Sequence, residues 1–248
     1  MTRNTALTPE ALPSGADGMI LRFALRPGPE AMAAAARLAQ RLEAAPPAGM
    51  VEICPALVSV FLRFDPARST RRALAEAVLA EARALLRDPP APPEPLRRWH
   101  LPVCFGGSHG PQLGEAARLA GLSETAAVAQ LCAADLRVLA IGFAPGQPYL
   151  GLLPEAWGFP RMSELNPSVP QGAVTVAVRQ LVIFAAQSAT GWRSIGRTAM
   201  RPFQPGRETP VPLRAGDAIR LSPVAPGEFD ALAEAADGMG GARPETLR

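Results

Sequence analysis

The first part of the chain switches between the hydrophobic spacing of strands and that of helices. Alternation over residues 19–25 predicts a strand, and apolar residues at helical spacing over 30–45 predict a helix that a Pro-Pro-Ala-Gly sequence ends. Two further strands are expected at 50–54 and 57–64. A second helix, with Ser or Thr available as its N-cap, is expected over 70–86.

A proline-rich segment at 88–95 forces an extended linker, and residues 98–103 would form one more strand after it. The resulting β-α-β-β-α-β order is that of a ferredoxin-like fold, in which two helices cover one face of a four-stranded antiparallel sheet. We therefore predict a flexible arm at 1–17 and a ferredoxin-like α+β domain at 18–95.

The second half of the chain has short apolar strands separated by long irregular connections. This arrangement is typical of a closed or nearly closed β-barrel, which we expect over 96–225, followed by a tail at 226–248. The expected elements are two short helices at 112–120 and 123–133 and strands at 136–141, 173–178, 181–185 and 217–221.

Composition narrows the chemistry that is open to this chain. All 25 basic residues are Arg, so there is no lysine for a Schiff base, a phosphate-binding loop or a cofactor linkage. The net charge of +3 is spread along the sequence and aromatic residues make up only 5%, which does not indicate nucleic-acid binding. Without a signal-peptide pattern or an apolar run of membrane-spanning length, we expect a soluble cytoplasmic protein with no membrane partner.

The cysteines and histidines do not form a known ligand or catalytic pattern. Cys54, Cys104 and Cys132 are odd in number and far apart, so neither a disulfide framework nor a zinc site is indicated, and buried thiols are expected. His100 and His109 are the only histidines, and a Ser-His-Asp arrangement is not indicated. We assign no metal site and no catalytic residue.

A first candidate binding loop covers residues 142–151 (GFAPGQPYLG). It directly follows a predicted buried strand and contains Phe143, Gly146 and Tyr149, the only tyrosine of the chain. Rigid prolines combined with permissive glycines suit a loop wall of fixed shape that approaches a ligand. Taken alone, the loop is equally compatible with a structural connection.

A second candidate loop covers residues 190–198 (TGWRSIGRT). It places Trp192 and Arg197 close together, and Arg161 is a further candidate at the end of the preceding long loop. Guanidinium groups bind carboxylates and phosphates with two parallel hydrogen bonds, so these arginines are candidate anion clamps. Arginines are abundant in this chain, so surface positions without a special role remain the alternative.

These loops and their neighbours resemble the allophanate hydrolase subunit 1 family. The family includes the B subunit of bacterial ATP-dependent 5-oxoprolinase, Kip-type inhibitors of a sporulation kinase, and half of the carboxyltransferase domain of urea carboxylase. The resemblance covers roughly residues 18–224, and it is the order and spacing of the motifs that is specific. The motifs are GFAPGQPYLG (142–151), PR (160–161), VPQGAV (169–174), GW (191–192), IGRT (195–198) and AGD (215–217).

The resemblance implies a ferredoxin-like domain followed by a cyclophilin-like β-barrel. It also implies a substrate site. Arg161 and Arg197 would hold a substrate carboxylate or a phosphorylated oxygen, Trp192 and Tyr149 would wall the pocket, and loop amides near Gly146 could stabilise an oxyanion.

Three positions depart from the family pattern. Leu131 stands where the family normally has a histidine, Asn166 falls within a replaced Pro-Arg pair, and Phe184 replaces a tyrosine. All three changes remove groups that could transfer a proton or hold an anion. We therefore expect either a partner that supplies the chemistry or a different substrate.

Three functions follow from the resemblance. The one we favour is the B subunit of a heteromeric ATP-dependent amidohydrolase that opens 5-oxoproline to glutamate, together with a homologous C subunit (allophanate hydrolase subunit 2-like) and a third, ATP-dependent subunit. The alternatives are a diverged non-catalytic regulatory protein of the kinase-inhibitor branch and half of a biotin-dependent carboxyltransferase. No cofactor is assigned to this chain, and ATP would serve the complex. Because lysine is absent, a biotinyl or nucleotide-binding lysine must come from another chain.

Overall fold

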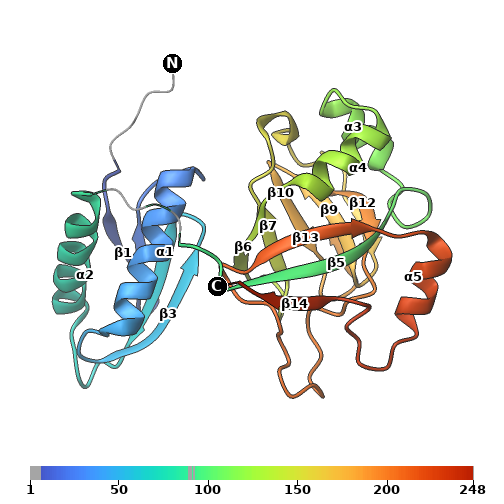
Figure 1. The fold of residues 1–248 in the computed structure, drawn as a ribbon. Helices are drawn as coiled ribbons and strands as arrows, with labels where there is room; N and C mark the ends of the chain where they lie inside the picture. Colours follow the sequence, from blue (N-terminus) through green and yellow to red (C-terminus); the bar gives the residue numbers. More distant parts are fainter. Residues whose placement is uncertain (1–6, 89–90, 92, 248) are drawn as a thin grey trace. The chain divides into compact units, whose positions relative to one another are not determined.

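The computed structural model describes residues 7–88, 91 and 93–247, and the chain divides into two compact units, Met1–Glu94 and Pro95–Arg248 (Figure 1). Each unit has its own hydrophobic core. The first unit is a sheet covered by two helices and the second is a barrel, so the α+β class predicted from the sequence is confirmed.

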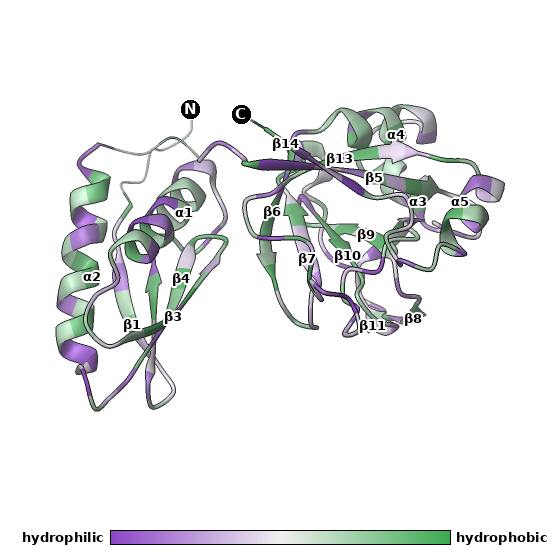
Figure 2. Cartoon of the chain, turned by 60° about the horizontal axis from the view of Figure 1, so that its bottom comes forward, coloured by the Kyte–Doolittle hydropathy of each residue, from purple (hydrophilic) through white to green (hydrophobic). Residues whose placement is uncertain are grey.

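The first unit is an antiparallel sheet with four strands among the described residues, in the order β1-β2-β4-β3. Helices α1 (Pro29–Ala44) and α2 (Arg71–Leu86) pack their apolar stripes on it, and Figure 2 shows these stripes alternating with hydrophilic ones. Thr70 caps α2, because its hydroxyl accepts a hydrogen bond from the Ala73 amide at 3.2 Å. The strands are β1 (Glu10–Ser14), β2 (Gly18–Arg22), β3 (Met50–Ala56) and β4 (Ser59–Phe64).

The source of one edge strand in this sheet differs from the prediction. Residues 10–14, which we expected within a flexible arm, form β1, and residues 98–103, expected as the last strand, lie in the second unit. A short turn at 15–17 joins β1 to β2, and its carbonyl oxygens accept hydrogen bonds of 2.7 and 2.6 Å from Arg71. Because so short a loop closes at little entropic cost, the local hairpin takes the edge beside β2.

The second unit is a β-barrel that closes with seven strands in the described part of the chain. The ring runs β12-β9-β10-β7-β6-β13-β5 and returns to β12, where Cys104 and Phe105 pair with Arg197 and Gly196. The β5–β13 pair is parallel and the other pairs in the ring are antiparallel. The predicted β-barrel is confirmed. The strands are β5 (Arg97–Phe105), β6 (Leu136–Ile141), β7 (Pro148–Gly151), β9 (Ala173–Ala177), β10 (Gln180–Ile183), β12 (Arg193–Arg197) and β13 (Ala218–Pro223).

One face of the barrel strands forms a continuous core with two short helices. Leu150, Val176 and Leu181 are fully buried there, and α3 (Leu113–Leu119) and α4 (Glu124–Ala133) contribute apolar residues to the same core. The remaining elements of this region are the one-turn helix η1 (Glu155–Trp157) and a small sheet of β8 (Asn166–Val169) with β11 (Ser188–Thr190). None of the helices in the described ranges is long and apolar enough to cross a membrane.

The segment predicted as a tail, 226–248, is regular structure over much of its described length. It contains α5 (Pro226–Ala233) and β14 (Arg243–Thr246), and β14 pairs antiparallel with the first half of β5. All four residues of β14 are exposed, so backbone pairing and exposed contacts of the Glu245 carboxylate with His100 and Arg98, at 2.9 and 3.5 Å, define this strand. A strand that buries no side chain leaves no hydrophobic pattern in the sequence, which explains why the prediction missed it.

A buried carboxylate ties the start of β13 to β5. Asp217 is 5% exposed, and its oxygens accept hydrogen bonds from Arg97 Nε at 3.0 Å and Nη2 at 2.6 Å, from Trp99 Nε1 at 3.1 Å and from the Arg214 amide at 2.8 Å. A buried charge is tolerated when it is paired and hydrogen-bonded in this way. The AGD motif singled out from the sequence therefore has a structural role here.

Candidate functional site

The opposite face of the β7, β10, β9 and β12 strands carries a second apolar cluster. Residues paired directly across antiparallel strands share one face of the sheet, and four of them form a row: Tyr149, Val182, Thr175 and Ser194. We call the apolar group on this face the outer cluster. It consists of Val169, Ala173, Ala177, Val182, Phe184 and Trp192, with Tyr149 packed against it.

Trp192 is held in the outer cluster by its own backbone and by one aromatic neighbour. Its amide donates to the Thr190 hydroxyl at 3.1 Å, and its carbonyl accepts from the Asn166 side-chain amide at 3.2 Å. Its ring meets the Tyr149 ring edge-on, with centroids 6.1 Å apart and planes at 74°. Trp192 is 5% exposed and Tyr149 is half-buried, so the two rings form a packed aromatic wall.

Arg161 lies over this wall. Its guanidinium carbon is 5.2 Å from the centre of the Trp192 ring, close enough for a cation–π interaction, while the residue itself is exposed. In the described part of the chain, Arg161 forms no ion pair. The structure therefore brings together three of the residues predicted from the sequence: Arg161, Trp192 and Tyr149. A cation over an aromatic face can accept a carboxylate while its stem covers apolar surface.

The sequence prediction missed the polar atoms of the same sheet face. Thr175 is fully buried, and its hydroxyl has no hydrogen-bond partner in the described structure. Next to it in the row, Ser194 is 5% exposed, and its amide donates to Gln112 Oε1 at 2.7 Å. An unpartnered buried hydroxyl costs stability. The only signal in the sequence was a single Thr in the apolar strand AVTVA.

Asn166, one of the three departures from the family pattern, has a structural role. Its side-chain nitrogen donates to Gln112 Oε1 at 2.9 Å as well as to the Trp192 carbonyl. It thereby connects the small β8–β11 sheet to the start of α3 and to the Trp192 loop. The amide maintains the shape of the site and offers no titratable group.

The other two residues that differ from the family pattern, Leu131 and Phe184, lie in apolar packing. Leu131 has no exposed surface and lies in the core shared by the barrel and α4. Phe184 is 4% exposed and belongs to the outer cluster with Trp192. A hydrophobic residue in each place strengthens packing and leaves these positions without a proton-transfer group.

The loop at 142–151 presents its candidate residues in different ways. Phe143 is 80% exposed with a φ of 72°, whereas Gly146 is buried with a φ of 71°. A Cβ at Gly146 would lie 2.6 Å from the Pro202 carbonyl oxygen, so only glycine fits this close approach. The side chain of the buried Gln147 accepts the Ala185 amide at 3.4 Å. The loop therefore packs its glycine inward and exposes its phenylalanine.

Arg197 has different neighbours from Arg161. Its Nε donates to the Gln171 carbonyl at 3.1 Å, and its guanidinium carbon lies 5.5 Å from the ring centre of Phe229 on α5. Together with Arg201 it lines a small hollow of about 110 Å³ that contains no acidic side chain. The two arginines predicted to act as clamps thus lie in different settings, one over the outer cluster and one in this hollow.

The thiols and acidic residues do not create a separate reactive centre in the described ranges. Burial raises the pKa of the Cys104 and Cys132 thiols, which keeps them protonated at neutral pH. Cys54, expected to be buried, is exposed on the edge strand β3. No three His, Cys, Asp or Glu residues there are grouped so that they could hold a metal ion.

Comparison with known proteins places this chain in a family. The family described as carboxyltransferase domain, subdomain C and D, matches residues 9–213, which includes most of both units. The chain belongs to this family.

Among its relatives, the 5-oxoprolinase B subunit of Bacillus subtilis (strain 168) is 29% identical over 236 residues, a match that covers 89% of this chain and 95% of that protein. The 5-oxoprolinase B subunit of Escherichia coli O157:H7 is 39% identical over 131 residues, covering 52% of this chain and 60% of the relative. The crystal structure of TTHA0988 superposes with a TM-score of 0.67 at 35% identity. That superposition covers 84% of this chain but only 40% of TTHA0988.

Proposed function

We propose that this chain is the B subunit of a heteromeric ATP-dependent amidohydrolase that opens the lactam of 5-oxoproline to glutamate. The proposal is supported by its family membership and by relatives that are named as B subunits of 5-oxoprolinase. In the structure, the observation that carries it is the cation of Arg161 stacked on Trp192 beside Tyr149. An arginine beside an aromatic wall can bind the carboxylate and the ring of a small cyclic acid.

Each residue of the site has a distinct part in this proposal. Arg161 binds the substrate carboxylate, and the Trp192 and Tyr149 rings flank the lactam ring. Arg197 lines a separate hollow with Arg201 and Phe229, so the proposal gives it no contact with the substrate that Arg161 holds. Hydrolysis adds one water across the lactam C–N bond, and ATP hydrolysis on another subunit drives the step. Arg161, Trp192 and Tyr149 bind and orient the substrate.

Partner subunits complete the site in this proposal. Leu131, Asn166 and Phe184 stand where the family resemblance implies a histidine, a Pro-Arg pair and a tyrosine, and in the described structure all three are used for packing or internal hydrogen bonds. A homologous C subunit and a third, ATP-dependent subunit would therefore supply the proton-transfer groups and any lysine that grips a nucleotide.

Reconstitution tests this function directly. The chain is mixed with the subunits encoded beside it, 5-oxoproline and ATP, and glutamate formation is measured. Arg161→Gln is expected to lower kcat/KM by about tenfold or more through loss of one charge-assisted bond. Arg118→Gln, at an exposed position of α3, is the matched control and should leave the rate unchanged. Absence of glutamate above background in the complete mixture would refute the 5-oxoprolinase assignment.

The family description itself favours a second candidate, half of a biotin-dependent carboxyltransferase. In that case the Arg161 and Trp192 pair would hold the acceptor of a carboxyl group delivered by a carboxylated biotin on another protein. A biotin carboxylase and a carrier protein encoded beside this gene, together with transfer of labelled bicarbonate, would support this candidate over the first.

The packed Leu131 and Phe184 favour a third candidate, a diverged regulatory protein without catalysis. Affinity purification with the full chain as bait separates it from the first two. Recovery of only a homologue of the C subunit would argue against it, whereas recovery of a kinase would support it.

A further inference from the structure

The segment that carries Arg161 passes from the barrel core to the outer cluster. Phe159 belongs to the core, whereas Arg161, two residues later, lies over Trp192 of the outer cluster. Arg161 is exposed, so the place of its guanidinium over the ring depends on how the backbone on either side is held.

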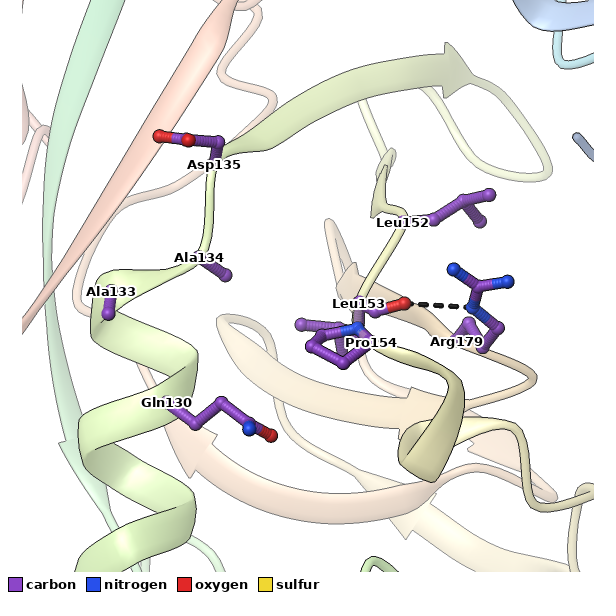
Figure 3. A pocket seen from close by; sticks show the side chains of 8 residues that line it. All are labelled: Gln130, Ala133, Ala134, Asp135, Leu152, Leu153, Pro154 and Arg179. Atoms are coloured by element: carbon purple, nitrogen blue, oxygen red, sulfur yellow. Dashed lines mark hydrogen bonds between the residues drawn. The ribbon is translucent and has the colours of Figure 1, made fainter. Parts of the chain in front are cut away.

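The turn between β9 and β10 anchors the start of this segment. Arg179 Nε donates to the Leu153 carbonyl at 2.8 Å, the bond drawn in Figure 3, and the Leu153 amide donates back to the Arg179 carbonyl at 2.8 Å. The Val178 amide donates to the Phe159 carbonyl at 2.9 Å. Val178 and Arg179 have φ angles of 46° and 65°, and a tight hairpin turn with positive φ at both central residues matches the twist of its strands. This anchor ends at Phe159 and leaves Arg161 to a second one.

Arg193 holds the chain immediately before Arg161. Its side chain is buried, and its Nη1 donates to the Pro160 carbonyl at 2.9 Å. Its Nε forms an ion pair of 2.9 Å with Glu115 of α3, and its guanidinium carbon lies 5.2 Å from the ring centre of Phe159. One planar guanidinium therefore contacts a carboxylate, a carbonyl and an aromatic ring at once.

The chain immediately after Arg161 is bonded to the Trp192 loop. The Met162 amide donates to the Gly191 carbonyl at 2.7 Å. A Cβ at Gly191 would lie 3.3 Å from the Met162 carbonyl oxygen and 3.6 Å from Arg161 Cβ, so the two segments approach closely. Gly191 and Arg193 are the two neighbours of Trp192 in the sequence. The residues on both sides of Arg161 are thus held by the residues on both sides of the ring that it covers.

We propose that Arg193 is a positioning residue for the candidate site. Through the Pro160 carbonyl it fixes the backbone of Arg161, and it thereby keeps the Arg161 guanidinium over Trp192, where the guanidinium binds the substrate carboxylate. Pro160 has no amide hydrogen, so its carbonyl is the one backbone group through which this position can be held. The binding of the carboxylate rests on the proposed function, whereas the placement of Arg161 does not depend on any reaction.

Arg97 provides a matched control, because it makes the same three kinds of contact elsewhere in the second unit. It pairs with Asp217 at 2.6 Å, donates to the Pro212 carbonyl at 3.3 Å and lies 5.7 Å from the ring centre of Trp99. Replacement of either arginine by lysine keeps the charge but leaves a single nitrogen, which cannot occupy both donor positions. Both variants should therefore lose thermal stability, and only Arg193→Lys should affect the candidate site.

NMR of the full chain measures the placement of Arg161 directly. Nuclear Overhauser effects between the Arg161 side chain and the Trp192 ring should be present in the unmodified chain and in Arg97→Lys. They should be at least about twofold weaker in Arg193→Lys, because the guanidinium no longer stays over the ring.

A second variant keeps this test decisive if Arg193→Lys folds poorly. Glu115→Ala removes the ion-pair partner from a half-buried position of α3, so it loosens Arg193 with little cost to the fold. It should weaken the same Overhauser effects. Unchanged effects in Arg193→Lys, or in Glu115→Ala where Arg193→Lys does not fold, would overturn the proposal.

Kinetics of the reconstituted complex test the consequence for the substrate. Arg193→Lys should raise KM for 5-oxoproline by about fivefold or more and change kcat by less than about twofold, because the bond to the carboxylate is made equally in the ground and transition states. In an Arg161→Gln background the same change should add nothing. An equal rise in KM in that background, or for Arg97→Lys, would show that Arg193 only stabilises the fold. A complete complex that forms no glutamate refutes the proposed function, and the Overhauser effects then still decide the role of Arg193.

Discussion

Strands β4 and β9 show how differently the two units use their sheets. Along β4, buried residues alternate with half-buried ones, so only one face of the first sheet is covered. Along β9, all five residues are buried, because the barrel core lies on one face and the outer cluster on the other. The barrel therefore has an additional packed layer, formed by the outer cluster. The predicted site residues Trp192 and Tyr149 lie in that layer.

The outer cluster is covered by short elements, β8 and the loop after β11, whose sequences have no regular hydrophobic periodicity. Val169 of β8 and Trp192, just after β11, supply apolar side chains that lie over β9 and β10. In the first unit the corresponding open face carries Phe61, Glu52 and Arg63, of which the last two form an ion pair at 2.9 Å. A polar face needs no cover, whereas a face of Ala, Val and Phe does.

The largest effect is expected from removing a phenylalanine on the covered face. Phe184→Ala should lower the unfolding free energy of the second unit by about 3–5 kcal/mol, through lost burial and a cavity. Phe61→Ala, at a half-buried position on the open face, should cost about 1 kcal/mol. All three tryptophans lie in the second unit, so their fluorescence follows that unit, and far-ultraviolet circular dichroism also follows α1 and α2. Equal losses would show that the outer cluster is not a packed layer.

The second-largest effect is expected when a buried carboxylate of the barrel is compared with an exposed ion pair of the first unit. Asp217→Ala should destabilise the second unit by about 3 kcal/mol, because it leaves Trp99 without an acceptor and Arg97 with only the Pro212 carbonyl. Glu76→Ala breaks the exposed Arg72–Glu76 pair and should change stability by less than about 0.5 kcal/mol. Urea titrations measure both. A loss for Asp217→Ala as small as for Glu76→Ala would contradict the structural role given to the AGD motif.

A smaller effect of opposite sign is expected at Thr175. Thr175→Val replaces an unpartnered buried hydroxyl by a methyl group and should stabilise the second unit by about 1 kcal/mol. Ser59→Val is a suitable contrast in the first unit, because its hydroxyl donates to the Ala56 carbonyl at 3.1 Å and the change should not stabilise. Destabilisation by Thr175→Val in thermal unfolding would mean that the hydroxyl has a partner in solution.

The smallest effect concerns the thiols of the two units. Partial burial and the Glu52 carboxylate, to which the thiol donates at 3.3 Å, raise the pKa of Cys54. A raised pKa means less thiolate at a given pH, so iodoacetamide should modify Cys54 slowly below its pKa and faster as the pH rises through it. Glu52→Gln should shift that rise to lower pH. Cys104 is buried and should stay unmodified in the folded protein, and a faster reaction at Cys104 than at Cys54 would reverse the comparison.

The sequence was a good guide to elements with one buried face and a poor guide to those without. The periods of α1, α2 and β4 place their boundaries within a few residues of the structure, because a single apolar stripe leaves a regular pattern. The strand β14 buries nothing, and β1 is a short hairpin partner that gains its place by pairing with β2. Neither β14 nor β1 therefore produces a periodic hydrophobic pattern in the sequence.

The candidate site shows the same division. Motif order predicts Trp192, Tyr149 and Arg161 as site residues, and in the structure Arg161 lies 5.2 Å from the Trp192 ring centre and the Tyr149 and Trp192 ring centres are 6.1 Å apart. It also separates Arg197 from them by giving it Phe229 and Arg201 as neighbours. Proximity in sequence does not reveal this separation. Arg197 pairs with Ala173 on the face that carries the outer cluster, but Trp192 directly precedes β12 and Arg197 is its last residue, so the two side chains lie at opposite ends of the strand.

By itself, the sequence determined the α+β class, the barrel, the family and the absence of lysine chemistry, because these depend on periodicity, motif order and composition. Tertiary structure alone decided which strand completes the first sheet, which strands are buried on both faces, and where the arginines point. These outcomes depend on pairing between residues far apart in the chain, and a linear pattern does not contain that information. The unpartnered Thr175 hydroxyl and the fixed Arg179 appear only when the strands on either side are in place.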